Sequence, residues 1–159
     1  MNPPDPILSL EHTHGHLNHL AIRIGEELTA RSGRVVPLSE AQRDEVVTLL
    51  EALRDELLVH FADEEEALFP FVRRWMPGSA ARVDRLEANH DAICGAVVRL
   101  AHLASHDSGL QLVALYERFQ RVYALHASEE AELLGELGRG LGPPERAELG
   151  SLLRALALG

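Results

Sequence analysis

The amino-acid sequence predicts an all-α protein, an up-down-up-down four-helix bundle with a short extra C-terminal helix. Three observations support this prediction. Apolar residues recur at intervals of three or four along four long segments, which is the spacing of one helix face. Glycine and proline gather between these segments. No segment shows the strict alternation of apolar and polar residues that is typical of a half-buried strand.

The first helix is expected to begin at Asp5-Pro6 and to run to about Ala30. An aspartate is a favoured N-cap, and proline is favoured at the first helical position. Ser32-Gly33 supplies a stop signal, and a short connection over Arg34–Leu38 should follow.

A second, long helix is expected from Ser39 to about Trp75, because Ser39 and Gln42 match the capping-box pattern. Pro70 lies inside this helix and should kink it or disturb it locally. Pro77-Gly78 then forms the turn to the next helix.

Ser79 should cap a third helix that runs to about Ser105, and residues 107–109 break it. The fourth helix is expected over Leu110–Leu137, and a short last helix over Pro143–Leu158. Three glycines should end the fourth helix: Gly138, Gly140 and Gly142.

Size and composition favour one domain over residues 1–159, with the bundle at about 5–140 and the last helix at about 143–158. Apolar residues form 46% of the 159 residues, enough for a sizeable core. The net charge of −10 argues against nucleic acid or an anionic membrane as a partner. Cys94 is the single cysteine, which excludes an internal disulfide. No signal-peptide pattern or membrane-spanning run is seen, so a cytoplasmic location is expected.

The chemical signal is a repeated pair, a histidine with a glutamate four residues later. His60 and Glu64 form one copy, and His126 and Glu130 form the other. Positions i and i+4 lie on the same helix face, one turn apart. Each copy therefore directs an imidazole and a carboxylate to the same place. Both copies fall on the apolar face of their helices, which we call the seam because it is expected to face the core.

Two further histidines occupy seam positions on the remaining long helices. The first helix repeats apolar residues in a seven-residue pattern, and His14 fills the vacant slot in that pattern. His90 lies on the seam of the third helix. At about 1.5 Å rise per residue, all six groups fall within a slab of about 12 Å. Five histidines lie off the seams or at a helix end: His12, His16, His19, His102 and His106.

A metal site explains this pattern better than a polar core without metal. A lone buried histidine or a lone surface His/Glu pair would be ordinary, but here six such groups share one depth. Two buried carboxylates that face each other repel, and a cation between them removes the repulsion. Imidazole and bridging carboxylates suit a pair of transition-metal ions, most plausibly iron. Zinc is less favoured, because it prefers closed four-coordinate sites.

Several neighbouring residues keep a simpler interpretation. Glu65, Glu66 and Glu129 are expected to be solvated, although Glu129 is the best alternative to Glu130. Tyr123 and Cys94 lie within one turn of a seam histidine and are candidates for contacts around the ligands, but core packing is favoured for both. Apolar neighbours should keep the pocket small and dry: Leu17, Leu57, Phe61, Leu68, Ile93, Phe119 and Val122.

The order of the motifs resembles the hemerythrin-like HHE cation-binding domain, over about residues 5–140. The closest likeness lies in the segment His60–Pro70, in Leu86–His90 and in His126–Glu130. The resemblance implies a non-haem di-iron site of the Fe–O–Fe type, in which two glutamates bridge the irons and two histidines serve each iron. The ligands that it implies are His14, His60, Glu64, His90, His126 and Glu130.

One position departs from the oxygen carriers of that family. They have a second histidine one turn from the histidine on the third helix, whereas this chain has Leu86 and Cys94 at that spacing. The missing ligand leaves one iron with an additional position, which favours redox reaction or sensing over reversible oxygen transport.

Three functions follow as hypotheses. The first is a di-iron protein that binds or senses dioxygen, nitric oxide, peroxide or iron itself. The second is a di-iron redox enzyme that acts on peroxide, oxygen or nitric oxide. The third is an iron-responsive interaction module, which would need a protein partner because the chain has no separate output domain.

Overall fold

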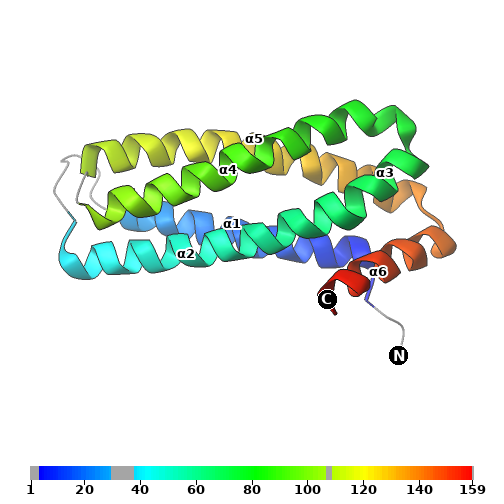
Figure 1. Cartoon of the computed structure of the whole chain (residues 1–159), viewed down its shortest axis with the longest axis horizontal. Helices are drawn as coiled ribbons and strands as arrows, with labels where there is room; N and C mark the ends of the chain where they lie inside the picture. The colour runs from blue at the N-terminus through cyan, green and yellow to red at the C-terminus, as the bar shows by residue number, and fades with distance from the viewer. Residues whose placement is uncertain (1–3, 30–37, 107–108, 159) are drawn as a thin grey trace. The chain divides into compact units, whose positions relative to one another are not determined.

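The computed structural model describes residues 4–29, 38–106 and 109–158, and every element in these ranges is helical (Figure 1). The elements are α1 (Pro6–Thr29), α2 (Glu40–Asp63), the π-helical turn η1 (Glu64–Leu68), α3 (Phe69–Trp75), the 3-10 turn η2 (Pro77–Ser79), α4 (Ala80–Ser105), α5 (Gly109–Gly140) and α6 (Pro143–Ala157). The predicted all-α class is confirmed and is consistent with a helical bundle. The up-and-down order of four helices stays a prediction.

Some sequence-based expectations fall on residues outside the described ranges. They concern Ala30, Ser32-Gly33, the connection that begins at Arg34, and the break at Asp107-Ser108. Among the described helices, none is both long and apolar enough to cross a membrane.

The predicted helix starts at Asp5 and Ser39 are confirmed by their hydrogen bonds. Asp5 Oδ1 accepts a hydrogen bond from the Ile7 N–H at 2.9 Å. The Ser39 N–H donates to Gln42 Oε1 at 2.9 Å, and the Gln42 N–H donates to Ser39 Oγ at 3.3 Å. These side chains satisfy N–H groups that have no partner inside their own helix. Ser79 is the last residue of η2 and directly precedes α4, which begins at Ala80, so it occupies the position expected of a cap, and its capping role stays a prediction.

A π-helical turn interrupts the long second helix just before Pro70. The Phe69 N–H bonds to the Glu64 carbonyl, five residues back, and regular α-helix resumes at Phe69. Pro70 has no N–H to donate, so the regular pattern of hydrogen bonds could not continue through it unchanged. The predicted disturbance is confirmed, and it takes the form of one widened turn.

The fourth long helix was expected to end at Leu137, but α5 continues to Gly140. Gly138 is helical, and a Cβ at this position would lie 3.9 Å from the Ile7 side chain. The Leu141 N–H still bonds to the Leu137 carbonyl at 2.9 Å. The glycine is tolerated within the helix, and the chain leaves helical geometry only just before the first proline of α6.

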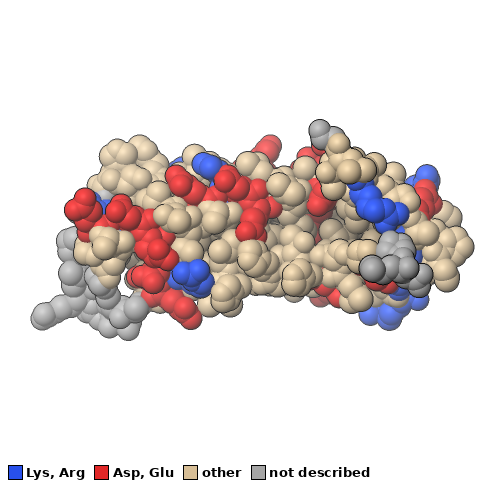
Figure 2. All heavy atoms as spheres, turned by 90° about the horizontal axis from the view of Figure 1, so that it is seen from below, with Lys and Arg blue, Asp and Glu red and all other residues tan. Residues whose placement is uncertain are grey.

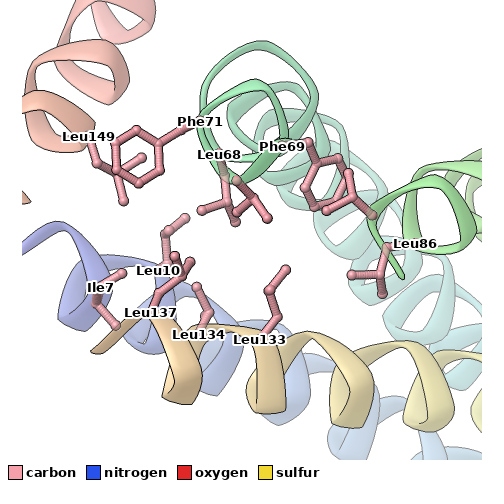
Figure 3. Close-up of a cluster of buried hydrophobic side chains, with 12 residues drawn as sticks. Ile7, Leu10, Leu68, Phe69, Phe71, Leu86, Leu133, Leu134, Leu137 and Leu149 are labelled. Carbon is pink, nitrogen blue, oxygen red and sulfur yellow. The ribbon is translucent and has the colours of Figure 1, made fainter. Parts of the chain in front are cut away.

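The chain divides into two compact units. Unit 1 holds residues 4–15, 59–90 and 126–158, and unit 2 holds residues 16–29, 38–58, 91–106 and 109–125. Unit 1 contains an apolar cluster to which α1, η1, α3, α4, α5 and α6 all contribute (Figure 3). Its members are Ile7, Leu10, Leu68, Phe69, Phe71, Val72, Val83, Leu86, Leu133, Leu134, Leu137 and Leu149.

The short helix α6 is attached to unit 1 by apolar and polar contacts. Leu149 is fully buried in the apolar cluster (Figure 3). Arg146 Nη1 lies 2.5 Å from Asp5 Oδ2, and the same guanidinium donates to the carbonyls of Gly138 and Leu141. One arginine thereby joins the start of α1 to the end of α5.

The core of unit 2 contains a buried tyrosine that was not predicted from the sequence. Tyr116 is 2% exposed, and its hydroxyl donates to the Ala21 carbonyl. Gly25 makes room for this ring, because a Cβ there would lie 3.2 Å from the Tyr116 hydroxyl. The prediction placed Val122 on the seam, and this was wrong, since Val122 is 45% exposed.

Acidic side chains are prominent on the surface. In unit 2, four acidic residues of α2 are exposed: Glu40, Asp44, Glu51 and Asp55. Figure 2 shows Asp and Glu side chains gathered over part of one face. This distribution agrees with the net charge of −10.

Candidate metal centre

The six predicted ligand residues are buried together in unit 1. Their exposed fractions are 9% for His14, 2% for His60, 0% for Glu64, 3% for His90, 2% for His126 and 1% for Glu130. The other five histidines are exposed. Helix register therefore separated the buried histidines from the exposed ones correctly.

One group of donor atoms is formed by His14, His60, Glu64 and Glu130, which offer atoms within 4.8 Å of one another. His14 Nε2 lies 2.6 Å from Glu130 Oε1 and 2.9 Å from His60 Nε2. His60 Nε2 lies 3.1 Å from Glu64 Oε1. We call these four residues the first donor group.

A second donor group is formed by Glu64, His90 and His126. His90 Nε2 lies 3.0 Å from Glu64 Oε2. His126 Nε2 lies 3.7 Å from Glu130 Oε2. Each glutamate therefore turns one oxygen toward the first group and the other oxygen toward the second, which is the arrangement of a carboxylate that can bridge two cations.

Local helix geometry explains how the paired residues converge. His126 and Glu130 lie one turn apart within α5. His60 lies in the last turn of α2, and Glu64 opens η1. His14 and His90 come from α1 and α4. The segments are far apart in the sequence, so the site exists only in the folded chain.

Several donor atoms of the site lack hydrogen-bond partners, which matches a ligand set and not a closed polar network. Both oxygens of Glu64, Glu130 Oε1, His90 Nε2 and His126 Nε2 are buried. Some of them lie 2.6–3.1 Å from another donor atom of the site, but none has a partner in hydrogen-bonding geometry among the described residues. Leaving such atoms unsatisfied costs roughly 1–3 kcal/mol each. A cation among them would satisfy several at once, so the residues fit a metal.

The two glutamates have opposite pKa shifts. Burial and the neighbouring Glu130 carboxylate raise the pKa of Glu64. Burial would also raise the pKa of Glu130, but contacts with Glu64, His14 and His60 outweigh it and hold that pKa well below its usual range. Without a cation, the pair therefore favours a proton on Glu64 and a charge on Glu130.

The pKa values of two histidines of the site are also shifted in opposite directions by their surroundings. Burial lowers the pKa of His60, but the carboxylates of Glu130 and Glu64 outweigh burial and raise it to about 10. Burial lowers the pKa of His126 to about 4, and the neighbouring histidines His90, His60 and His14 add to this effect. His126 therefore offers a neutral imidazole, the form that binds a metal.

Two phenylalanines hold the ring of His90. Phe61 stacks on it with ring centroids 3.7 Å apart and planes 6° apart. Phe69 stacks at 5.6 Å and 22°. Phe61 also meets His126 edge-on, with centroids 5.5 Å apart. The second donor group is thus packed against aromatic side chains.

Glu65 is the contact that the sequence analysis missed. It was expected to be solvated and is 41% exposed, yet its Oε1 lies 2.6 Å from His90 Nδ1. In a regular helix, neighbouring residues point about 100° apart, so Glu65 would not share a target with Glu64. The π-helical turn changes that relation, and Pro70 is the sequence signal that could have indicated it.

The remaining candidates occupy other positions. Glu129 pairs with Arg85 at 2.7 Å. Leu86 is fully buried, with 0% exposure to solvent, and belongs to the apolar cluster of unit 1. Tyr123 belongs to unit 2, where it stacks on Phe119 at 5.6 Å, and Cys94 is a partly buried residue of the same unit. The roles of Tyr123, Cys94 and Glu129 around a metal stay predictions.

The comparisons with known proteins point to one family. A family model described as the hemerythrin HHE cation-binding domain matches residues 5–137. No curated protein and no solved structure gives a significant match to the chain.

Proposed function

Since the chain belongs to the hemerythrin HHE cation-binding domain family, we propose that it is a non-haem di-iron protein that binds or senses a small ligand, such as dioxygen, nitric oxide or peroxide, or iron itself. One observation carries the proposal. Two convergent donor groups share Glu64, and the oxygens of Glu130 are divided between them.

We assign the ligands by donor group. His14 and His60 would hold one iron, and His90 and His126 the other, with Glu64 and Glu130 bridging both. The first iron then has four close protein donors, and the second has three, with Glu130 Oε2 as a more distant fourth at 3.7 Å from His126 Nε2. Both irons keep positions for a small ligand. Imidazole nitrogen with carboxylate oxygen suits iron, whereas structural zinc prefers a closed tetrahedron.

The surroundings limit what can reach the site. The aromatic rings of Phe61 and Phe69 and the side chain of Leu86 are buried. Such an apolar environment excludes organic substrates and admits diatomic molecules or peroxide. When bound, the iron pair would supply redox-active positions for such a ligand, and the protein residues would hold the irons and keep bulk water away.

The acidic surface supports the proposed cation binding, because negative charge attracts cations to the protein. A net charge of −10 and the exposed acidic residues seen in Figure 2 raise the local concentration of cations. The same charge disfavours nucleic acid and anionic membranes as partners. A cytoplasmic location remains our expectation.

A redox enzyme is the second candidate, and the smaller number of donors in the second group favours it. Three residues form that group, compared with four in the first. The position taken by Leu86 adds no further ligand. An iron with an open position can react with its ligand as well as bind it.

The experiment that separates these functions exposes the iron-loaded protein to nitric oxide or hydrogen peroxide. A reversible change in the absorption spectrum, without consumption of the ligand, would support binding or sensing. Catalytic consumption would contradict the pure binding function and establish the enzyme. The variant His126→Ala, which loses a ligand of the second group, should abolish either response.

A role as an iron-responsive interaction module makes a separate prediction. Iron should then raise the midpoint of thermal unfolding, because it would satisfy buried donor atoms that lack hydrogen-bond partners without it. An unchanged midpoint with and without iron would contradict this role.

A further inference from the structure

We infer that Glu65 is a positioning residue of the second donor group, which holds the ring of His90 so that Nε2 faces the metal. The inference rests on the proposed di-iron function. It adds a residue outside the six ligands, one that the family match does not assign. Glu65 would touch no metal and would act only through His90.

The two ring nitrogens of His90 face two consecutive glutamates. Nδ1 lies 2.6 Å from Glu65 Oε1, and Nε2 lies 3.0 Å from Glu64 Oε2. A carboxylate can only accept a hydrogen bond, so the nitrogen that faces Glu65 must carry the hydrogen. In a neutral imidazole the other nitrogen then keeps its lone pair, and this is the nitrogen that faces the donor group.

The contact also completes the orientation of the ring. Phe61 and Phe69 stack on His90 and fix the plane of the imidazole. Stacking alone does not distinguish the two orientations related by a 180° flip about the Cβ–Cγ bond, which exchanges Nδ1 with Cδ2 and Nε2 with Cε1. The hydrogen bond from Nδ1 to Glu65 selects one of these two orientations.

His60 and His126 lack a comparable hydrogen bond. Their Nδ1 atoms are buried and find no hydrogen-bond partner among the described residues. Histidines that bind metals usually donate their second ring hydrogen to a carboxylate or carbonyl. Of these three histidines, His90 is therefore the one whose orientation is set before a metal arrives.

The π-helical turn makes this double contact available. Glu64 and Glu65 are the first two residues of η1, and both reach the same imidazole. Glu65 remains 41% exposed, so its replacement leaves the apolar core of unit 1 intact. This exposure makes the residue suitable for a clean test.

The test is an anaerobic titration of the full chain with Fe²⁺ against a competing chelator, on wild type, Glu65→Ala, Glu65→Gln and Glu66→Ala. Loss of such a partner typically weakens metal binding by about 10–100-fold. Glu65→Ala should show this weakening at one of the two sites and leave the other unchanged. Glu65→Gln keeps an oxygen that accepts the Nδ1 hydrogen, so it should recover most of the affinity.

Glu66→Ala is the matched control. Glu66 is the next residue of η1, carries the same charge, and makes no hydrogen bond or ion pair with another described residue. Its replacement should leave both affinities at the wild-type values. Equal losses in Glu65→Ala and Glu66→Ala would show that only the charge matters and would overturn the inference.

A spectroscopic readout separates positioning from general destabilisation. In Mössbauer spectra of the loaded protein, Glu65→Ala should alter the signal of one iron, and Glu65→Gln should restore it. If wild type binds two irons and Glu65→Ala behaves like wild type, the positioning role fails alone. If the wild-type protein itself does not bind two irons, the result contradicts the proposed di-iron function and, with it, the positioning role of Glu65.

Discussion

The two donor groups differ in how many ligands they offer and in how firmly those ligands are held. The first group has four residues, but the Nδ1 atom of His60 has no hydrogen-bond partner among the described residues. The second group has three residues. The Nδ1 atom of its His126 also lacks a partner among the described residues, but its His90 stacks on two phenylalanines and bonds to Glu65. The first group therefore offers more donor residues than the second, which favours retention of a cation. The second holds a well-oriented ligand beside an open position.

The largest expected effect is the loss of both metals in Glu130→Ala. Like Glu64, Glu130 approaches histidines of both groups with its two oxygens, at 2.6 Å from His14 Nε2 and 3.7 Å from His126 Nε2. Removing it should reduce bound iron from about two per chain to none after dialysis, as measured by elemental analysis. Retention of one tightly bound iron would show that the groups are independent.

A second prediction concerns Phe61, which contacts the second group. Phe61→Ala removes a buried ring and should lower the free energy of unfolding by about 3–5 kcal/mol. It should also weaken metal binding more in the second group than in the first, because His90 loses its closest stacking partner. Urea unfolding and metal titration measure the two effects.

Phe61→Leu is the control for packing. It keeps most of the buried apolar volume but removes the stacking on His90. Equal weakening of both metal sites in Phe61→Ala would argue against a local role for the ring.

The pH dependence of the metal-free protein follows from His60 in the first group. Its pKa is raised from 6.5 to about 10 in the folded state, so its charged form stabilises the fold fully below pH 6.5. This contribution is lost as the pH rises through about 10. The thermal midpoint of metal-free protein should therefore fall between pH 7 and pH 10.

Iron binding should depend on pH in the opposite direction from the stability of the metal-free protein. A histidine ligand must be neutral and a glutamate ligand must be ionised, so loading iron at pH 7 should release the protons of His60 and Glu64, and iron affinity should increase with pH. Proton release in weakly buffered solution measures this directly. His60→Ala should release fewer protons than the wild type and keep only part of the pH dependence, and a wild-type protein that releases no proton would contradict the assignment of His60.

The smallest effect is expected for Glu129→Ala, one residue from Glu130. Glu129 pairs with the exposed Arg85 at 2.7 Å, a contact of the surface type that contributes about 0–1 kcal/mol. Iron content should stay at the wild-type value, and chemical unfolding should shift only slightly. Loss of iron would instead make Glu129 a ligand, the alternative that the sequence left open.

Seam residues of the site could be predicted because heptad spacing and burial have the same physical cause. His14 filled a vacant slot in an apolar pattern, and it is 9% exposed, whereas His12 and His16 beside it are exposed. The caps at Asp5 and Ser39 were equally predictable, since their side chains bond to N–H groups within three residues.

Contacts that depend on irregular backbone could not be predicted. Glu65 reaches His90 because η1 departs from α-helical geometry, and helical periodicity takes no account of such a turn. On α5, the buried positions before His126 include Tyr116 and Tyr123 beside the predicted Phe119, whereas the predicted Val122 is 45% exposed. Hydrophobicity favoured the aliphatic residues, but the alternating spacing of three and four residues back from His126 selects the tyrosines.

The most direct test of the two-group site is anomalous X-ray scattering at the iron edge from crystals of the iron-loaded protein. Two peaks are expected in each chain, one among His14, His60, Glu64 and Glu130 and the other among Glu64, His90 and His126. A single peak, a peak away from these residues, or a scattering edge that belongs to zinc would contradict the two-group site.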